Sequence, residues 1–247
     1  MADRLFTDAY LATLYDLWHP RSVRDDYDFY LPRIMAAGSV LDLGCGTGTL
    51  LIDARQRDHR GRLCGLDPAA GMLQRARRRP DIEWVLGDLD STRLAREFDL
   101  VVMTGHAFQA VVGEAELKTL VANVRRVLSP GGSFAFETRN PAARAWESWR
   151  PENAVTVVGP EGEVVTITTK VVAPFDGETV SFTHTFTGAH PALPQVSHST
   201  LRFLDEHDLD ELLAESGLRV EERYGDFQGA SFTPDSPEII TIARADA

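Results

Sequence analysis

A glycine-rich turn between an apolar run and a helical pattern offers the clearest chemistry in this chain. Residues 40–50 read VLDLGCGTGTL, with Asp42 two residues before Gly44 and Gly46 two residues after it. Glycine lets a ligand approach the backbone where a Cβ atom would collide, and open α/β sheets bind ligands beyond the carboxyl ends of their strands. The dinucleotide fingerprint G-x-G-x-x-G would require glycine where Thr49 stands. The spacing therefore disfavours a nicotinamide dinucleotide.

Acidic residues close the next two apolar runs. Asp67 ends RLCGLD, where a carboxylate can accept both hydroxyl groups of a ribose. Asp88 ends IEWVLGD, where it can accept an adenine amino group beside the backbone of Leu89. Taken singly, each aspartate is equally well explained as a turn or cap residue. A purely structural turn is the less favoured explanation of the glycine-rich stretch. Their occurrence at successive strand ends indicates a nucleoside site.

A histidine follows the fourth apolar run. The stretch FDLVVMTGHAFQ places Gly105 and His106 at a strand end, where His106 is a general base, a substrate-orienting group or a structural histidine bonded to a carbonyl. The stretch ETRNP, after the fifth run, places Glu137, Arg139 and Asn140 on the rim of the site. Arg139 either binds a substrate carboxylate or pairs with Glu137. The alternative interpretations of His106 and of Arg139 remain open.

Three further histidines, His184, His190 and His198, invite comparison with a metal site. Their spacings of six and eight residues match no common ligand set. We therefore expect no metal.

The elements that position these residues follow from hydrophobic periodicity. Strand and helix patterns alternate from residue 39 to residue 138, as in a parallel sheet buried on both faces. The expected strands cover 39–44, 62–67, 82–88, 98–103 and 133–138, and the expected helices 49–57, 69–79 and 114–128. We expect two helices, outside the sheet, before residue 38.

The second half of the chain has a different period. From about 153 to 204 apolar residues alternate, which predicts an antiparallel sheet with a hairpin around PFDG. Its strands are expected at 163–172, 179–188 and 198–204. A capped helix at 205–217 and two strands, 218–225 and 237–245, then close the main sheet.

Composition limits the partners of this chain. Its 247 residues, 43% of them hydrophobic, allow one domain with an appended lobe. The net charge of −12 repels nucleic acids and anionic membranes. Cys45 and Cys64 lack CxxC spacing, and no targeting segment or long apolar stretch is present in the sequence. We therefore expect a cytoplasmic enzyme that acts on a small molecule.

From residue 38 to residue 140 the chain resembles the class I S-adenosylmethionine-dependent methyltransferases, on the motifs quoted above. The resemblance implies a Rossmann-like, doubly wound α/β sheet of seven strands with the last one antiparallel. It implies S-adenosyl-L-methionine as cofactor and S-adenosyl-L-homocysteine as product. The implied cofactor contacts are Asp42, Gly44, Gly46 and Gly105 around the methionine part, Asp67 at the ribose, and Pro68, Met72, Asp88 and Leu89 around the adenine.

The outer segments are similar to bacterial small-molecule methyltransferases, including those that N-methylate amino sugars. The similarity lies in YDLWHPRSVRDDY and in the antiparallel insertion. It implies that Tyr15 and Tyr27 lie over the cofactor as part of a lid, with Tyr15 also near the reacting atoms. Trp18, Arg139 and Asn140 are the expected acceptor-binding residues, although packing explains Trp18 and Tyr30 equally well.

These implications give a domain plan and a function. We expect an N-terminal helical lid (1–37), a cofactor-binding core (38–140), an inserted β lobe for the acceptor (141–204) and the rest of the core (205–247). The expected reaction is in-line transfer of a methyl group to nitrogen or oxygen of a small molecule, through proximity and desolvation, with His106 as candidate base.

Two alternatives are a noncatalytic scaffold that binds the same cofactor and a nicotinamide-dependent oxidoreductase. The stretch MTGHAF lacks the Asn/Asp-Pro-Pro-aromatic motif of family members that methylate nucleobases or glutamine. The identity of the acceptor and the choice between monomer and homodimer are left open.

Overall fold

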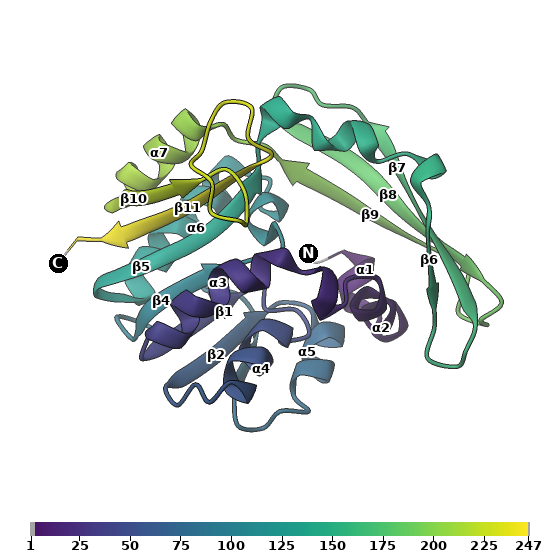
Figure 1. Ribbon diagram of the computed structural model, residues 1–247, viewed down its shortest axis with the longest axis horizontal. Coiled ribbons are helices and arrows are strands. Elements are labelled where there is room, and N and C mark those ends of the chain that lie inside the picture. Colours follow the sequence, from purple (N-terminus) through teal and green to yellow (C-terminus); the bar gives the residue numbers. More distant parts are fainter. Residues whose placement is uncertain (1–2, 247) are drawn as a thin grey trace.

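The main sheet has seven strands in the order β10-β11-β5-β4-β1-β2-β3. It is seen in a computed structural model that describes residues 3–246 (Figure 1). Its strands are β1 Ser39–Leu43, β2 Arg62–Asp67, β3 Glu83–Leu86, β4 Phe98–Met103, β5 Leu128–Arg139, β10 Leu218–Tyr224 and β11 Glu238–Ala245. The β1 to β5 pairings are parallel, whereas β11 runs antiparallel to both β5 and β10. The predicted sheet, including its antiparallel last strand, is confirmed.

Helices cover both faces of this sheet because its central strands are apolar on both sides. On one face, Val40, Leu63 and Val102 pack against α3 (Asp25–Ala36) and α4 (Thr49–Gln56). On the other face, Leu41 and Phe134 pack against α6 (Glu114–Val127) and α7 (Glu206–Glu215). The short helix α5 (Ala70–Ala76) follows β2. Because successive side chains of a strand point to opposite faces, each buried strand contacts both helix layers, and helices on both faces make the sheet doubly wound.

Two boundaries differ from the sequence expectation. Helix α5 ends at Ala76 and leaves Arg77, Arg78 and Arg79 in the turn that follows. Strand β5 begins at Leu128 rather than at Ser133, because the stretch LSPGG (128–132) forms a bulge within the strand. The register against β4 shifts there, and Gly131 has a φ of +71°.

A second sheet of four antiparallel strands is inserted between β5 and α7. Its strands are β6 Val155–Val158, β7 Val164–Ala173, β8 Thr179–Gly188 and β9 Gln195–Arg202, in that order across the sheet. The predicted β7–β8 hairpin around PFDG is confirmed, and β6 is an additional edge strand. The connection from β5 contains the short 3-10 helices η3 (Pro141–Ala143), η4 (Ala145–Ser148) and η5 (Pro151–Asn153).

The first two helices occupy the space between the two sheets. Helices α1 (Arg4–Thr7) and α2 (Ala9–Trp18) lie between the core and the inserted sheet, and η1 (Arg21–Val23) leads to α3 (Figure 1). Leu5, Leu11 and Leu14 pack on the inner face of the inserted sheet against Val165 and Phe186. Three α-helices thus precede residue 38 instead of two, and α3 packs on the main sheet.

Among residues 3–246, no helix is both long and apolar enough to cross a membrane.

Candidate active site

The glycine-rich turn leaves β1 with three residues in the left-handed region. Gly44, Gly46 and Gly48 have φ values of +72°, +56° and +77°. A Cβ atom on Gly46 would meet nothing within 4 Å, whereas one on Gly48 would lie 2.3 Å from the ring of Trp84. Gly46 therefore borders open space, and Gly48 lets the turn pack closely against Trp84 and Ala76.

Asp67, at the end of β2, fixes the shape of this turn. Its Oδ2 accepts a hydrogen bond from the Gly46 amide (2.8 Å), and its Oδ1 accepts one from the Ala69 amide (2.7 Å). Burial raises the pKa of this carboxyl, and the two amide bonds oppose that rise. Each carboxylate oxygen retains a second lone pair. Asp67 can therefore hold the turn and accept a ligand hydroxyl together.

Asp42, within β1, carries an unpartnered oxygen. Its side chain is 1% exposed, and its Oδ1 has no hydrogen-bond partner among residues 3–246. Burial, reinforced by the negative charge of Asp67, raises the pKa of Asp42 to about 8. Burying a carboxylate oxygen without a hydrogen-bond donor or a cation is unfavourable. An ammonium group such as that of the methionine part would supply one, so the residues present fit the implied cofactor.

The residues expected around an adenine lie at the ends of β2 and β3. The Gly87 amide donates to the Asp67 carbonyl (3.0 Å), so the two strand ends are adjacent. Asp88 is exposed and accepts from the Ser91 amide (2.9 Å). Leu89 and Met72 are buried, and Pro68 is exposed. Met72 lies against Ala12 of α2.

Arg24 lies next to Gly105, at the end of β4, and was not among the predicted site residues. The Arg24 guanidinium stacks 4.1 Å from the ring of Tyr27 and pairs with Asp26 (2.6 Å). A Cβ atom on Gly105 would lie 3.2 Å from Arg24 Nη2. Tyr15, in α2, makes an edge contact with Phe6 at 5.8 Å between centroids. The signal for Arg24 was its position inside YDLWHPRSVRDDY, three residues before Tyr27.

His106 is held by two carboxylates. Its backbone amide donates to Glu137 Oε1 (2.8 Å), and its Nε2 lies 2.9 Å from Glu238 Oε2. Glu137 also accepts from the Tyr30 hydroxyl (2.6 Å) and is fully buried, below the rim on which the sequence placed it. His106 is therefore bonded to a carboxylate rather than to a carbonyl. Glu238 is the second site residue that sequence reasoning missed.

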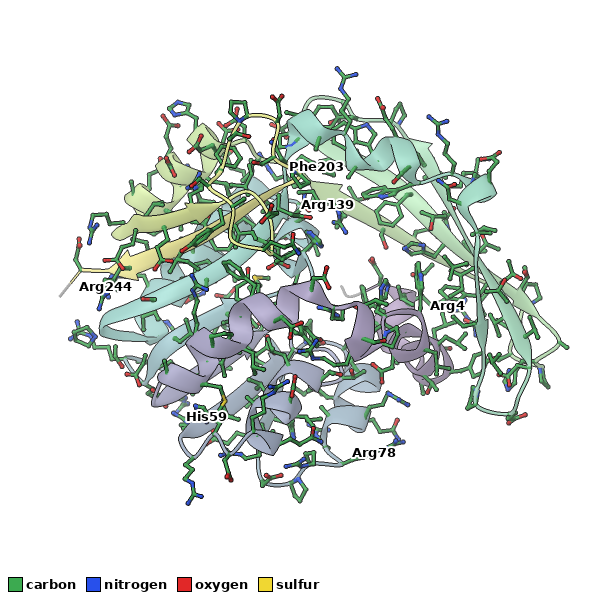
Figure 2. The ribbon with its side chains drawn as sticks, in the orientation of Figure 1. Arg4, His59, Arg78, Arg139, Phe203 and Arg244 are labelled. Carbon is green, nitrogen blue, oxygen red and sulfur yellow. The ribbon has the colours of Figure 1, made fainter. Side chains whose placement is uncertain are left out.

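Arg139 and Asn140, both at the end of β5, have different surroundings. No carboxylate among residues 3–246 lies within 4 Å of the Arg139 guanidinium, so the expected alternative of pairing with Glu137 is not observed. Arg139 Nη1 donates to Gln109 Oε1 (3.3 Å), and its guanidinium lies 5.5 Å from the ring centroid of Trp149, where the two sheets meet (Figure 2).

The Asn140 side chain is fully engaged within the protein. Its amide nitrogen donates to the carbonyls of Pro234 (2.9 Å) and Ser236 (2.8 Å), and its oxygen accepts from the Ala142 amide (3.1 Å). Asn140 secures the loop that leads into β11, and we leave it out of the acceptor set.

Aromatic side chains lie where α2 packs on the inserted sheet. Trp18 stacks on His19 (4.5 Å between centroids) and meets His184 edge-on at 4.9 Å. Thr169 Oγ1 lies 3.0 Å from His184 Nδ1. Burial lowers the pKa values of His19 and His184 to about 4, so both rings are neutral at pH 7. His190 lies apart, stacked on Tyr10, and residues 3–246 contain no cluster of three metal-ligating side chains.

The family model and the relatives that match this chain are methyltransferases. Residues 40–132 match the methyltransferase domain family. The chain is 28% identical over 214 residues to the cypemycin N-terminal methyltransferase of a Streptomyces species, covering 85% of this chain and 84% of that protein. It is 33% identical over 134 residues to the dTDP-3-amino-3,4,6-trideoxy-alpha-D-glucopyranose N,N-dimethyltransferase of Streptomyces venezuelae, covering 51% of this chain and 56% of that protein.

Solved methyltransferase structures have a similar fold. The CcbJ methyltransferase from Streptomyces caelestis superposes with a TM-score of 0.77 at 23% identity, over 98% of both chains. The similarity therefore includes the inserted sheet and the N-terminal helices as well as the core.

Proposed function

We propose, from the premise that this chain is a class I S-adenosylmethionine-dependent methyltransferase, that it methylates an amino group of a small molecule bound between the core and the inserted sheet. The observation that carries the proposal is the unpartnered Asp42 oxygen beside an open glycine turn. One relative is named an N-terminal methyltransferase and the other an N,N-dimethyltransferase of an amino sugar nucleotide, which supports an amine over a hydroxyl.

The proposed cofactor site is built from the ends of β1 to β4. Asp42 and the glycine turn hold the ammonium end of the methionine part, and Arg24, above Gly105, holds its carboxylate. Asp67 accepts the ribose hydroxyls. Asp88 and the backbone of Leu89 take the adenine edge, between Pro68 and Met72. Tyr15 and Tyr27 close over the cofactor from the N-terminal side.

The bound cofactor supplies an electrophilic methyl group. The chain's own residues then have to hold the acceptor in line with that methyl and exclude water. Trp18 and Arg139 contact the acceptor from opposite sides, since they lie on α2 and at the end of β5. His106 accepts the proton that the acceptor releases.

The experiment that tests this proposal separates binding from turnover. Calorimetric titration with S-adenosylhomocysteine, beside a fluorescence titration with NADH, should show binding of the first alone; NADH binding would favour an oxidoreductase. Methyl release is then measured with a panel of amines and phenols. Turnover with amines supports the proposal, and cofactor binding with no turnover across the panel favours a scaffold.

Asp67→Ala should lose most of the affinity for S-adenosylhomocysteine. The matched control is Glu152→Gln, which removes an exposed carboxylate in η5. Equal affinity in the two variants would contradict the assigned ribose contact.

We also propose a bacterial, cytoplasmic setting and no nucleic-acid partner. Support comes from the Streptomyces relatives, the free thiols of Cys45 and Cys64, and the net charge of −12.

A further inference from the structure

The contact between His106 and Glu238 joins two strand ends far apart in the sequence. His106 follows β4, Glu238 begins β11, and their side chains meet at 2.9 Å. We propose that Glu238 is a positioning residue that keeps the Nδ1 lone pair of His106 free to take the acceptor's proton, and only while Glu238 is ionised. The inference rests on the proposed function, because it assigns His106 a proton to accept.

The hydrogen bond determines where the imidazole proton sits. An ionised carboxylate can only accept, so His106 Nε2 then carries the proton and Nδ1 carries the lone pair. Nδ1 has no hydrogen-bond partner among residues 3–246, and the His106 side chain is 18% exposed. A ligand can therefore reach it. When Glu238 is protonated, its hydroxyl donates to Nε2, and the ring proton moves to Nδ1.

The backbone of His106 is fixed independently of its ring. His106 has a φ of +60°, which a residue other than glycine adopts only when its surroundings impose it. The bond from its amide to Glu137, and the bond from Tyr30 to Glu137, supply that constraint. Because β5 and β11 pair with Arg139 opposite Glu238, Glu137 and Glu238 approach His106 from neighbouring strands. Glu137 thus holds the main chain, and Glu238 orients the ring.

Several charges face this pair from the surrounding elements. They are Glu137 and Arg139 at the end of β5, and Arg24 and Asp26 at the start of α3. Burial, with help from Arg139, lowers the pKa of His106 to about 3. Burial raises the pKa of Glu238 to about 7, against the opposing charge of Arg139. His106 is therefore neutral at pH 7, where Glu238 changes its charge.

The proton and electron balance of the step is simple. The acceptor's lone pair forms the new bond to the methyl carbon, and the electron pair of the broken carbon–sulfur bond stays on sulfur. The N–H proton of the acceptor passes to His106 Nδ1. The positive charge that forms on the ring lies opposite ionised Glu238, and the proton then leaves to solvent.

The test reads the tautomer directly and requires no methyl acceptor. Protein labelled with nitrogen-15 in its histidines is saturated with S-adenosylhomocysteine, and long-range proton–nitrogen spectra are recorded from pH 5.5 to 8.5. His106→Gln identifies the His106 signals. In the wild type, Nδ1 should be unprotonated at pH 8.5 and become protonated with a midpoint near 7.

In Glu238→Gln and Glu238→Ala that step should disappear, whereas Glu152→Gln should retain it. The Gln variant keeps the size of the side chain, and the wild-type titration needs no variant at all. A step that survives in Glu238→Gln, or a wild-type Nδ1 that keeps one protonation state throughout, overturns the proposal.

Turnover provides a second readout with any amine that the wild type methylates. Turnover by the wild type should rise through pH 7, and Glu238→Gln should lose that rise together with about 100-fold of kcat at pH 8. Its KM for S-adenosylmethionine should stay within about twofold. If no amine is methylated but the tautomer step is present, the proposed function fails while the Glu238 assignment stands.

Discussion

Asp16 of α2 accepts a hydrogen bond from the hydroxyl of Thr47 in the glycine-rich turn, at 2.6 Å. Its second oxygen accepts from Arg75 of α5, at 2.8 Å. One partly buried carboxylate thus connects the N-terminal helices to two elements of the proposed cofactor site.

Asp16→Ala should weaken both folding and cofactor binding. It removes the shared carboxylate and leaves Thr47 only its contact with Thr49 and Arg75 only its bond to Thr13. The loss should cost about 1–3 kcal/mol of unfolding free energy. Urea unfolding and calorimetry with S-adenosylhomocysteine measure the two effects. Asp28→Asn, which changes a carboxylate that is 70% exposed, serves as the control. Identical behaviour of the two variants would show that the Asp16 contacts carry little energy.

Asp42 should make cofactor binding depend on pH. Its raised pKa, about 8, means that a proton must leave before the carboxylate can pair with an ammonium group. The affinity for S-adenosylhomocysteine should therefore rise from pH 6 toward pH 8, by up to about tenfold per pH unit. Calorimetry at several pH values measures this dependence. A Glu152→Gln control should retain it, and Asp42→Asn should abolish it.

The same shift predicts the pH dependence of stability without ligand. A folded-state pKa raised above the unfolded value of 3.8 gives stability that is complete below that value and is lost as pH rises toward about 8. Asp42→Asn should remove this loss. Urea midpoints at pH 5 and pH 8 give the comparison, and an unchanged difference between the two pH values in the variant would contradict it.

Alanine at Gly46 and at Gly48 should have different effects. Both positions have positive φ, which costs an alanine about 1–2 kcal/mol. Gly48→Ala also drives a methyl group into Trp84 and should lower the melting temperature further. Gly46→Ala faces open space, so it should fold but lose affinity for S-adenosylhomocysteine. Normal binding by folded Gly46→Ala would exclude the turn from the cofactor site.

Arg139→Met should act on the methyl acceptor rather than on the cofactor. The lost charge-assisted contact is worth about 1.5–3 kcal/mol, so the KM of an anionic acceptor should rise about tenfold or more. Cofactor affinity should not change. Arg144→Met, at an arginine that is 68% exposed, is the control. Steady-state kinetics with amines that carry a carboxylate measure the KM. Weaker cofactor binding by Arg139→Met would place Arg139 at the cofactor instead of at the acceptor.

The core was predictable because its signals are local. The central strands β1, β2, β4 and β5 are apolar runs, and the residues that define the turn after β1 are contiguous. Glu238 was not predictable from its surroundings, because its meeting with His106 depends on how β11 pairs with β5. Asn140 was misplaced for the same reason, since the loop that engages it arrives from residues 234–236. Edge strand β6 is short, so its alternation is weak.

The position of α1 and α2 between the two sheets affects folding during synthesis. The Leu5 amide donates to Ser197 Oγ, 192 residues later, and Leu5, Leu11 and Leu14 pack on strands of the inserted sheet. At about 5–20 residues per second, a ribosome needs about 10–40 s between these two residues. During that interval the apolar side of the first helices lacks its partner. A nascent chain should therefore need shielding at its amino end until β9 has emerged.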